Sequence, residues 1–182
     1  MSGPIRGGPI GVEDVATALH AVRLSQPRSA DAAAVVGGGP LALATLAVLL
    51  ARGVGKVALV ADGPGASPTA VGASVLRLPA SEEALEQARH SLGGYGPDFV
   101  FECEGDSETR RLAIELARPA GMVVLVADRQ KPTSMNPNLL VFADRRVQGS
   151  RGFEAADIEI ARDLIEAGRL RLNGLGNGEG GT

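Results

Sequence analysis

Several residue types are scarce in this chain of 182 residues, and each shortage narrows what the protein can be. A single cysteine, Cys103, excludes an intrachain disulfide and a zinc site built from several cysteines. Tryptophan is absent and aromatic residues make up 3% of the chain, which disfavours base-stacking surfaces and aromatic cages. The net charge of −3 provides no basic footprint for nucleic acid.

Long apolar runs are missing as well. The longest, near residues 41–50, is too short to cross a bilayer and is flanked by turn residues. The first residues, MSGPIRGG, lack the apolar core of a signal peptide. We therefore predict a cytoplasmic protein that binds neither membranes nor nucleic acid.

Short apolar runs alternate along the chain with segments of helical periodicity. Near-continuous apolar runs are typical of parallel strands that are buried on both faces. The runs predict strands at Ala32–Val36, Lys56–Ala61, Val75–Leu78, Asp98–Cys103, Met122–Ala127 and Arg145–Gly149. The intervening patterns predict helices near 12–25, 41–52, 81–92, 107–117 and 154–167, with Ser107 as the N-cap of the fourth.

This alternation predicts an α/β fold of the Rossmann type: a doubly wound parallel sheet of about six strands with helices on both faces. We predict that the Gly/Pro-rich residues 1–11 form a flexible N-terminal lead and that the polar, glycine-rich residues 173–182 form a flexible C-terminal tail. Residues 12–172 are then a single Rossmann-like domain, because no internal repeat or second compositional block is visible.

A glycine-rich turn follows the first predicted strand, in the stretch AVVGGGPLA. Its spacing is Gly37-x-Gly39-x-x-Ala42. The two glycines permit a tight turn and close approach of a pyrophosphate, and the small Ala42 lets the helix pack on the strand. Pro40 suits the first helical turn, and the helix directs its amides, including that of Leu41, toward an anion. The pattern favours a dinucleotide site, whereas a purely structural turn remains the alternative reading.

The order of these segments resembles the cofactor-binding half of the medium-chain, zinc-type alcohol dehydrogenases. VEDVATALHAV is similar to the helix that enters that domain, and AVVGGGPLALATLAVLLARGVGKVALV resembles its nucleotide turn and helix. PDFVFECEG resembles the fourth strand, and RRVQGSRGFEAADIEIARDLIEAGRL the sixth strand and last helix. The resemblance runs from about Val12 to Leu172.

The resemblance implies a bound NAD or NADP and a set of residues that touch it. With the glycine turn included, the predicted cofactor-binding residues are Gly37, Gly39, Pro40, Leu41, Ala42, Asp62 and Gly105. The adenosine end departs from the family pattern, since Ala61 occupies the usual acidic position and Asp62 lies one residue further on. The next helix is also reduced to GPGASPTAVGA, too rich in Gly and Pro for three turns. We therefore expect NAD(P) binding to be weak or lost.

The family's catalytic domain, a separate and mostly β module, has no counterpart in these 182 residues. The resemblance therefore implies no self-sufficient zinc-dependent hydride transfer, and we predict no metal site and assign no catalytic residue. Glu13 falls where some family members carry a glutamate near the zinc, but one carboxylate cannot hold a catalytic zinc, and a solvated first-turn residue is the better reading.

Other reactive residue types have structural interpretations that we favour. We predict that His20 packs on its helix, that His90 lies at the surface, that Cys103 is a buried inert thiol and that Tyr95 anchors a loop. We predict that Arg110 and Arg111 lie on the solvated face of their helix. Glu102 and Glu104 flank Cys103 and point to the same side of their strand, and Glu104, beside Gly105, is expected to be exposed.

Three functions remain open on these observations. The first is an alcohol dehydrogenase-like oxidoreductase component that needs a partner supplying the substrate module. The second is a cofactor-free structural or regulatory partner, and the third is a biosynthetic enzyme that uses the switch-point cleft for non-redox chemistry on a small molecule. A homodimer through the edge of the last strand, or a hetero-complex, is expected because the resemblance places a pairing edge at RRVQGSRG.

Overall fold

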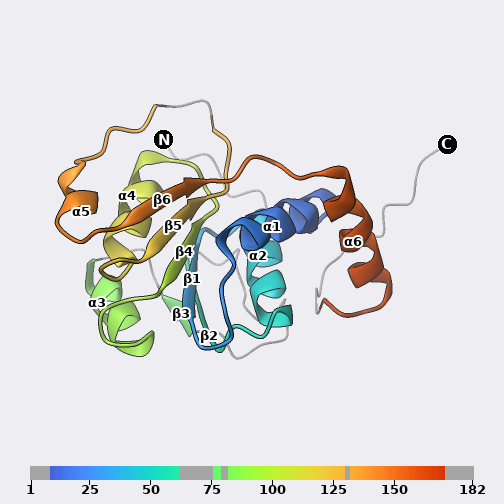
Figure 1. The fold of residues 1–182 in the computed structure, drawn as a ribbon, viewed down its shortest axis with the longest axis horizontal. Helices are drawn as coiled ribbons and strands as arrows, with labels where there is room; N and C mark the ends of the chain where they lie inside the picture. Colours follow the sequence, from blue (N-terminus) through green and yellow to red (C-terminus); the bar gives the residue numbers. More distant parts are fainter. Residues whose placement is uncertain (1–8, 62–75, 79–81, 130–131, 171–182) are drawn as a thin grey trace.

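Six strands form one sheet in the computed structural model, which describes residues 9–61, 76–78, 82–129 and 132–170. The strands are β1 (Ala32–Val36), β2 (Lys56–Val60), β3 (Leu76–Leu78), β4 (Phe99–Glu102), β5 (Met122–Leu125) and β6 (Arg146–Gly149). Their order is β3-β2-β1-β4-β5-β6, and every pairing is parallel (Figure 1). The predicted doubly wound sheet is confirmed, and its strand order reverses between β1 and β4.

Helices cover both faces of the sheet, as predicted (Figure 1). Two helices, α1 (Val12–Ser25) and α2 (Pro40–Ala51), pack on one face, and α6 (Ala155–Glu166) packs against α1. Two more pack on the other face: α3 (Glu82–Ser91) and α4 (Ser107–Leu116). A short helix, α5 (Asn138–Val141), follows β5 and was not expected from the sequence, because four residues are too few to show a helical period.

The central strand β1 explains why its sequence is apolar at every position. Ala33 and Val35 lie in the core under α1 and α2, whereas Ala32, Ala34 and Val36 lie in the core under α3 and α4. All five residues are buried. Helix α2 is buried in the same way, from Ala42 to Leu49, which confirms the expectation of a buried helix after the glycine turn.

The ends of several elements differ from their predicted positions by one or two residues. Strand β4 ends at Glu102, although the amide of Cys103 still donates to the carbonyl of Val36. Helix α4 has Asp106 as its N-cap, not Ser107, because the Asp106 side chain accepts a hydrogen bond from the Thr109 amide at 2.8 Å. These differences leave the topology unchanged.

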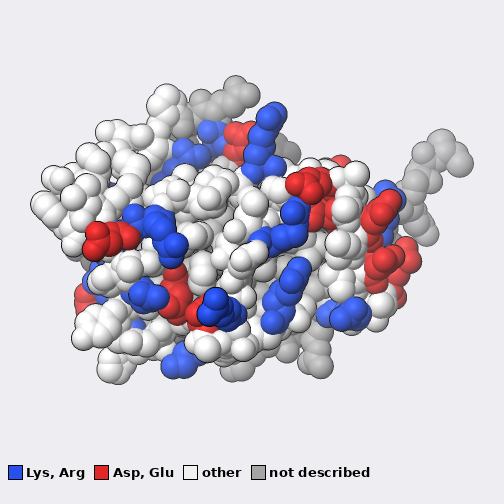
Figure 2. All heavy atoms as spheres, in the orientation of Figure 1, with Lys and Arg blue, Asp and Glu red and all other residues white. Residues whose placement is uncertain are grey.

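Some predictions fall on residues outside the described ranges. These are Asp62, Val75, the stretch 63–73, residues 1–8 of the predicted lead and the whole predicted tail. The division of the chain at residues 11 and 172 therefore stays a prediction. Within the described part of the chain, no helix is both long and apolar enough to span a membrane. Basic and acidic side chains are interspersed on the face drawn in Figure 2.

Candidate functional site

The glycine turn connects β1 to α2 at the carboxyl end of the sheet. Gly37 has φ +132°, a conformation that favours glycine, and its amide donates to the Val60 carbonyl at 2.9 Å. Gly39 is the N-cap of α2, and a Cβ added to it would meet nothing within 4 Å. Pro40 follows as the first helical residue. The backbone is therefore open above Gly39 and shaped for the close approach of a ligand.

The first turn of α2 presents backbone donors at this opening. Leu41 and Ala42 are the next helical residues, and no side chain caps the helix within the described part of the chain. Such amides and the positive end of the helix dipole favour an anion. The turn thus brings together five of the predicted binding residues, Gly37, Gly39, Pro40, Leu41 and Ala42, and their role in cofactor binding stays a prediction.

A carboxylate of the chain already occupies part of this turn. The amide of Gly38 donates a hydrogen bond to Glu104 Oε1 at 2.8 Å. A Cβ added to Gly37 would lie 3.0 Å from both Cγ and Oε1 of Glu104, so the carboxylate rests against the glycine backbone. The Glu104 side chain is 19% exposed. The expectation that Glu104 is exposed was wrong, because the register of β4 on β1 brings it over the turn.

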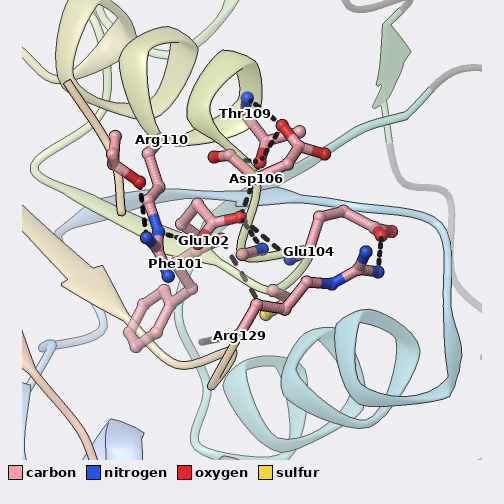
Figure 3. Close-up of polar contacts among 10 residues, drawn as sticks. Phe101, Glu102, Glu104, Asp106, Thr109, Arg110 and Arg129 are labelled. Atoms are coloured by element: carbon pink, nitrogen blue, oxygen red, sulfur yellow. Dashed lines mark hydrogen bonds and ion pairs between the residues drawn. The ribbon is translucent and has the colours of Figure 1, made fainter. Parts of the chain in front are cut away.

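Arg129, in the segment after β5, holds the other oxygen of this carboxylate. Its Nη2 lies 3.7 Å from Glu104 Oε2 (Figure 3). The arginine stem passes over Gly105, where an added Cβ would lie 2.9 Å from Arg129 Cγ. Gly105 has φ +79° and is buried beneath this stem. A role for Gly105 in cofactor binding stays a prediction.

Glu102, at the end of β4, is completely buried and organises the turn that follows it. Its Oε1 accepts three hydrogen bonds, from the amides of Glu104 at 2.9 Å and Gly105 at 2.7 Å and from Thr109 Oγ1 at 2.8 Å (Figure 3). One carboxylate oxygen thus fixes the loop that carries Glu104 and ties it to α4. The sequence pattern places Glu102 and Glu104 on either side of Cys103 but does not predict this role of Glu102.

The second oxygen of Glu102 faces Arg110. Arg110 Nε lies 3.8 Å from Glu102 Oε2, and neither atom has a hydrogen-bond partner among the described residues. Arg110 Nη1 donates to Thr133 Oγ1, in the segment between β5 and α5. Arg110 is therefore not on a solvated face, contrary to expectation, and it links the end of β4 to the segment after β5. Arg111 is half-exposed and pairs with Glu115.

Cys103 lies between the two glutamates in sequence but on the opposite face of the sheet. The side chain is buried, and Thr45 Oγ1 lies 3.6 Å from its Sγ. Burial raises the pKa of the Cys103 thiol far above its ordinary value, and the nearby carboxylates add to this rise. The predicted burial of the thiol is confirmed, and its inertness stays a prediction.

Elsewhere, the remaining candidate residues take structural positions. His20 lies on α1 with its Nδ1 3.2 Å from Asp157 Oδ2 on α6, in keeping with the predicted packing role. Glu13 and His90 are exposed, as expected. Tyr95 is 77% exposed, so the prediction of a loop anchor was wrong. In the ranges that the structure describes, no three His, Cys, Asp or Glu side chains are placed to hold a metal ion, so these residues do not fit the zinc that the family implies.

A cavity of about 390 Å³ lies at the opposite end of the strands, next to the first residues of β4, β5 and β6. Several charged side chains that line it are already paired with other groups of the protein. Asp98 accepts from Arg118 Nε at 2.6 Å and from the Ala32 amide at 2.8 Å. The ligand-binding end of a doubly wound sheet is the carboxyl end, so the site of interest remains the glycine turn.

Comparison with known proteins agrees with this geometry. A family model described as "Zinc-binding dehydrogenase" matches residues 40–167. (R,R)-Butanediol dehydrogenase of Bacillus subtilis (strain 168) is 33% identical over 144 residues, which make up 78% of this chain and 41% of that protein. (R,R)-Butanediol dehydrogenase of Neisseria gonorrhoeae is 27% identical over 165 residues, 88% of this chain and 46% of that protein. The chain therefore spans about half the length of the curated relatives it matches.

Solved structures show the same correspondence. The 2R,3R-butanediol dehydrogenase from Bacillus subtilis superposes with a TM-score of 0.73 at 28% identity, covering 87% of this chain and 52% of that one. A Sinorhizobium meliloti 1021 protein solved with bound NADP superposes with a TM-score of 0.76 at 26% identity, covering 87% and 48%. The resemblance seen in the sequence is confirmed: the chain belongs to the zinc-binding dehydrogenase family and corresponds to its cofactor-binding half.

Proposed function

We propose that this chain is the nucleotide-binding component of an alcohol dehydrogenase-like oxidoreductase and that it binds NAD or NADP weakly. The observation that carries the proposal is the open glycine turn at the point where the strand order reverses, between β1 and β4. The substrate and any zinc would be bound by a module outside these 182 residues. The NADP held by the Sinorhizobium relative supports the choice of ligand.

Backbone groups would do most of the binding. Gly37 and Gly39 let the pyrophosphate approach, and the amides of Leu41 and Ala42 at the start of α2 would hold it. The bound dinucleotide would supply the hydride-transfer chemistry. The adenosine end is weaker, because the buried Ala61 after β2 offers no carboxylate to the ribose. Losing a hydrogen bond to a charged group costs about 1.5–3 kcal/mol, and each 1.4 kcal/mol is about tenfold in affinity.

Calorimetric titration with NADH and NADPH tests the proposal. We expect dissociation constants well above 10 µM, in the range from about 100 µM to a few mM, as these losses imply. A Gly39→Val variant should lose this binding but remain folded, because a Cβ added to Gly39 would meet no atom of non-adjacent residues within 4 Å, and the larger side chain would hinder the close approach of a pyrophosphate. A dissociation constant below about 10 µM, or a Gly39→Val variant that binds as well as the parent, would contradict the proposal.

A cofactor-free structural or regulatory role is the second candidate, and one observation favours it. The Gly38 amide already donates a hydrogen bond to the Glu104 carboxylate, so this donor is not available to a pyrophosphate bound at the turn. Under this reading neither dinucleotide binds at millimolar concentration. The same titration therefore separates the two functions.

We also propose that the chain forms a homodimer through the outer edge of β6. This strand lies at the end of the sheet, and all four of its residues are exposed. Large apolar side chains are exposed in this strand, at Val147 (38%), and at the end of α5, which precedes it in the chain, at Val141 (67%) and Phe142 (85%). An exposed strand edge with apolar neighbours is a pairing surface, and two-fold closure is its commonest solution.

Light scattering at micromolar concentration tests the dimer, which would have twice the chain mass of 18.6 kDa. The amides of Arg146 and Ser150 donate to the β5 side, so by alternation the amide of Val147 points outward. A Val147→Pro variant removes this outward donor but keeps the ladder to β5, and it should be monomeric. Val147→Thr, which keeps the amide, should stay dimeric. A monomeric parent protein, or a dimeric proline variant, would refute the edge pairing.

A further inference from the structure

We propose that Glu104 lowers the affinity of the glycine turn for anions. Its carboxylate accepts the hydrogen bond of the Gly38 amide and so competes with the pyrophosphate of a dinucleotide for the turn. The identity of that ligand rests on the function proposed above. The occupation of the turn by Glu104 rests on the structure alone. Nothing in the sequence pattern Gly37-x-Gly39-x-x-Ala42 indicates such an occupant.

The position of Glu104 follows from the sheet. β1 and β4 are paired so that Val36 lies beside Glu102, and both strands therefore end at the same level. Two residues beyond Glu102, the Glu104 side chain reaches across the switch point to the Gly38 amide, with a hydrogen bond of 2.8 Å. The missing Cβ of Gly37 leaves the space that the Glu104 carboxylate fills. The glycine that would let a phosphate approach thus accommodates a carboxylate.

Both oxygens of Glu104 have a partner, which distinguishes it from an exposed glutamate with many rotamers. Oε1 accepts from Gly38, and Oε2 lies 3.7 Å from Arg129 Nη2 (Figure 3). An incoming pyrophosphate would have to break the charge-assisted bond to Gly38 and would experience repulsion from a carboxylate close by. Both effects reduce the affinity for anions, and removal of the carboxylate reverses both.

The local fold does not depend on Glu104. The loop after β4 is held by Glu102 through the Glu104 and Gly105 backbone amides, and α4 is capped by Asp106. None of these contacts uses the Glu104 side chain. A Glu104→Ala variant should therefore fold and leave the turn in place. Glu108, exposed in the first turn of α4, provides a control with the same change of charge.

The experiment follows the Gly38 amide in nitrogen–proton NMR spectra while inorganic pyrophosphate is added. The parent protein, Glu104→Ala, Glu104→Gln and Glu108→Ala are compared. We expect the Gly38 signal to move with pyrophosphate in Glu104→Ala, with an affinity at least about tenfold higher than in the parent. Glu104→Gln, which keeps an acceptor but loses the charge, should lie between them. Glu108→Ala should match the parent.

Equal responses of Gly38 in the parent and in Glu104→Ala, or none in either, would overturn the proposal. A gain in Glu108→Ala equal to that in Glu104→Ala would also overturn it, because net charge alone would then explain the effect. Titration of the same variants with NADPH tests the proposed function separately. If Gly38 responds to pyrophosphate in Glu104→Ala but no variant binds NADPH, the nucleotide function fails and the role of Glu104 in anion binding stands.

Discussion

Two buried carboxylates differ in how completely they are hydrogen-bonded: Asp157 on α6 and Glu102 at the end of β4. Asp157 joins α6 to α1: it accepts from the Glu154 amide at 2.9 Å and from Arg23 at 3.2 Å, and His20 Nδ1 lies at 3.2 Å. Glu102 receives three hydrogen bonds on Oε1, whereas its Oε2 has no partner within the described residues and faces Arg110 at 3.8 Å.

The difference in hydrogen bonding indicates that the Asp157 cluster is structural, whereas the Glu102 cluster belongs to the candidate site. Around Asp157 the buried charge is fully paired, as expected of groups that only hold two helices together. Around Glu102 one buried oxygen and one guanidinium nitrogen remain without hydrogen bonds, and the adjacent Glu104 rests on the glycine turn. Among the described residues, two of the three buried side-chain atoms without a hydrogen-bond partner therefore lie where the strand order reverses, the third being Ser150 Oγ after β6. The point of reversal is where a doubly wound sheet binds its ligands.

The largest effect on stability should come from removing Glu102. A Glu102→Ala variant leaves two backbone amides and Thr109 Oγ1 without this acceptor, and it leaves the largely buried Arg110 without the carboxylate that lies 3.8 Å from its Nε. Breaking a buried pair by removing one partner costs about 3–5 kcal/mol in the free energy of unfolding, measured here by urea denaturation. Glu102→Gln should lose less, because its amide oxygen can still accept. A loss below about 1 kcal/mol in Glu102→Ala would show that this cluster does not organise the loop.

Removing Asp157 should have a smaller effect. Arg23 is 45% exposed and can be solvated by water when its partner is lost, so Asp157→Ala should cost about 1.5–3 kcal/mol. Urea denaturation of this variant and of Glu108→Ala, as a surface control within about 0.5 kcal/mol of the parent, checks the prediction. If Asp157→Ala were as costly as Glu102→Ala, the contrast between the two clusters would have no energetic basis.

The smallest expected effect is on the pH dependence of stability. Burial raises the pKa of Asp157, but the Glu154 amide, Arg23 and His20 lower it more, and the net pKa lies below its ordinary value. The stabilisation is therefore fully present above about pH 4, the pKa in the unfolded chain, and is lost as the pH falls through the lower pKa of the folded protein. The loss is about 1.4 kcal/mol for each tenfold change in the acid dissociation constant.

An Asp157→Asn variant should lose less stability than the parent between pH 6 and pH 3, measured by urea denaturation with circular dichroism. The remaining slope should include Asp98, whose pKa is also lowered: burial raises it, and the Ala32 amide and Arg118 outweigh that rise. Identical pH profiles for the parent and Asp157→Asn would contradict the assignment.

The sequence predicts the sheet well because the strands are buried on both faces. The five residues of β1 are all apolar, and the glycine turn and the buried helix α2 follow directly. This pattern predicts a buried parallel strand followed by a helix. Helix α5 was missed because it is short and has no buried residue. The Tyr95 loop was misjudged because an isolated aromatic side chain carries no periodic signal.

The site was predicted only in part, because its contacts join distant segments. The turn residues Gly37 to Ala42 follow from local spacing, but Glu104 meets Gly38 across 66 positions. A signal was available: the alternation of a strand predicts that Glu102 and Glu104 point to the same side, and the strand order of this fold places β4 next to β1. His20 and Asp157, 137 residues apart, share no comparable signal in a single sequence.

The hydrogen bond between Gly38 and Glu104 is the contact on which the account depends, and NMR can detect it without any ligand. We predict a scalar coupling across the hydrogen bond between the Gly38 amide nitrogen and the Glu104 carboxylate carbon in the parent protein. In Glu104→Ala this coupling should vanish, and the Gly38 amide proton should shift upfield by an amount not seen in Glu108→Ala. A Gly38 amide without this coupling in the parent, and with the same chemical shift in Glu104→Ala, would contradict the account.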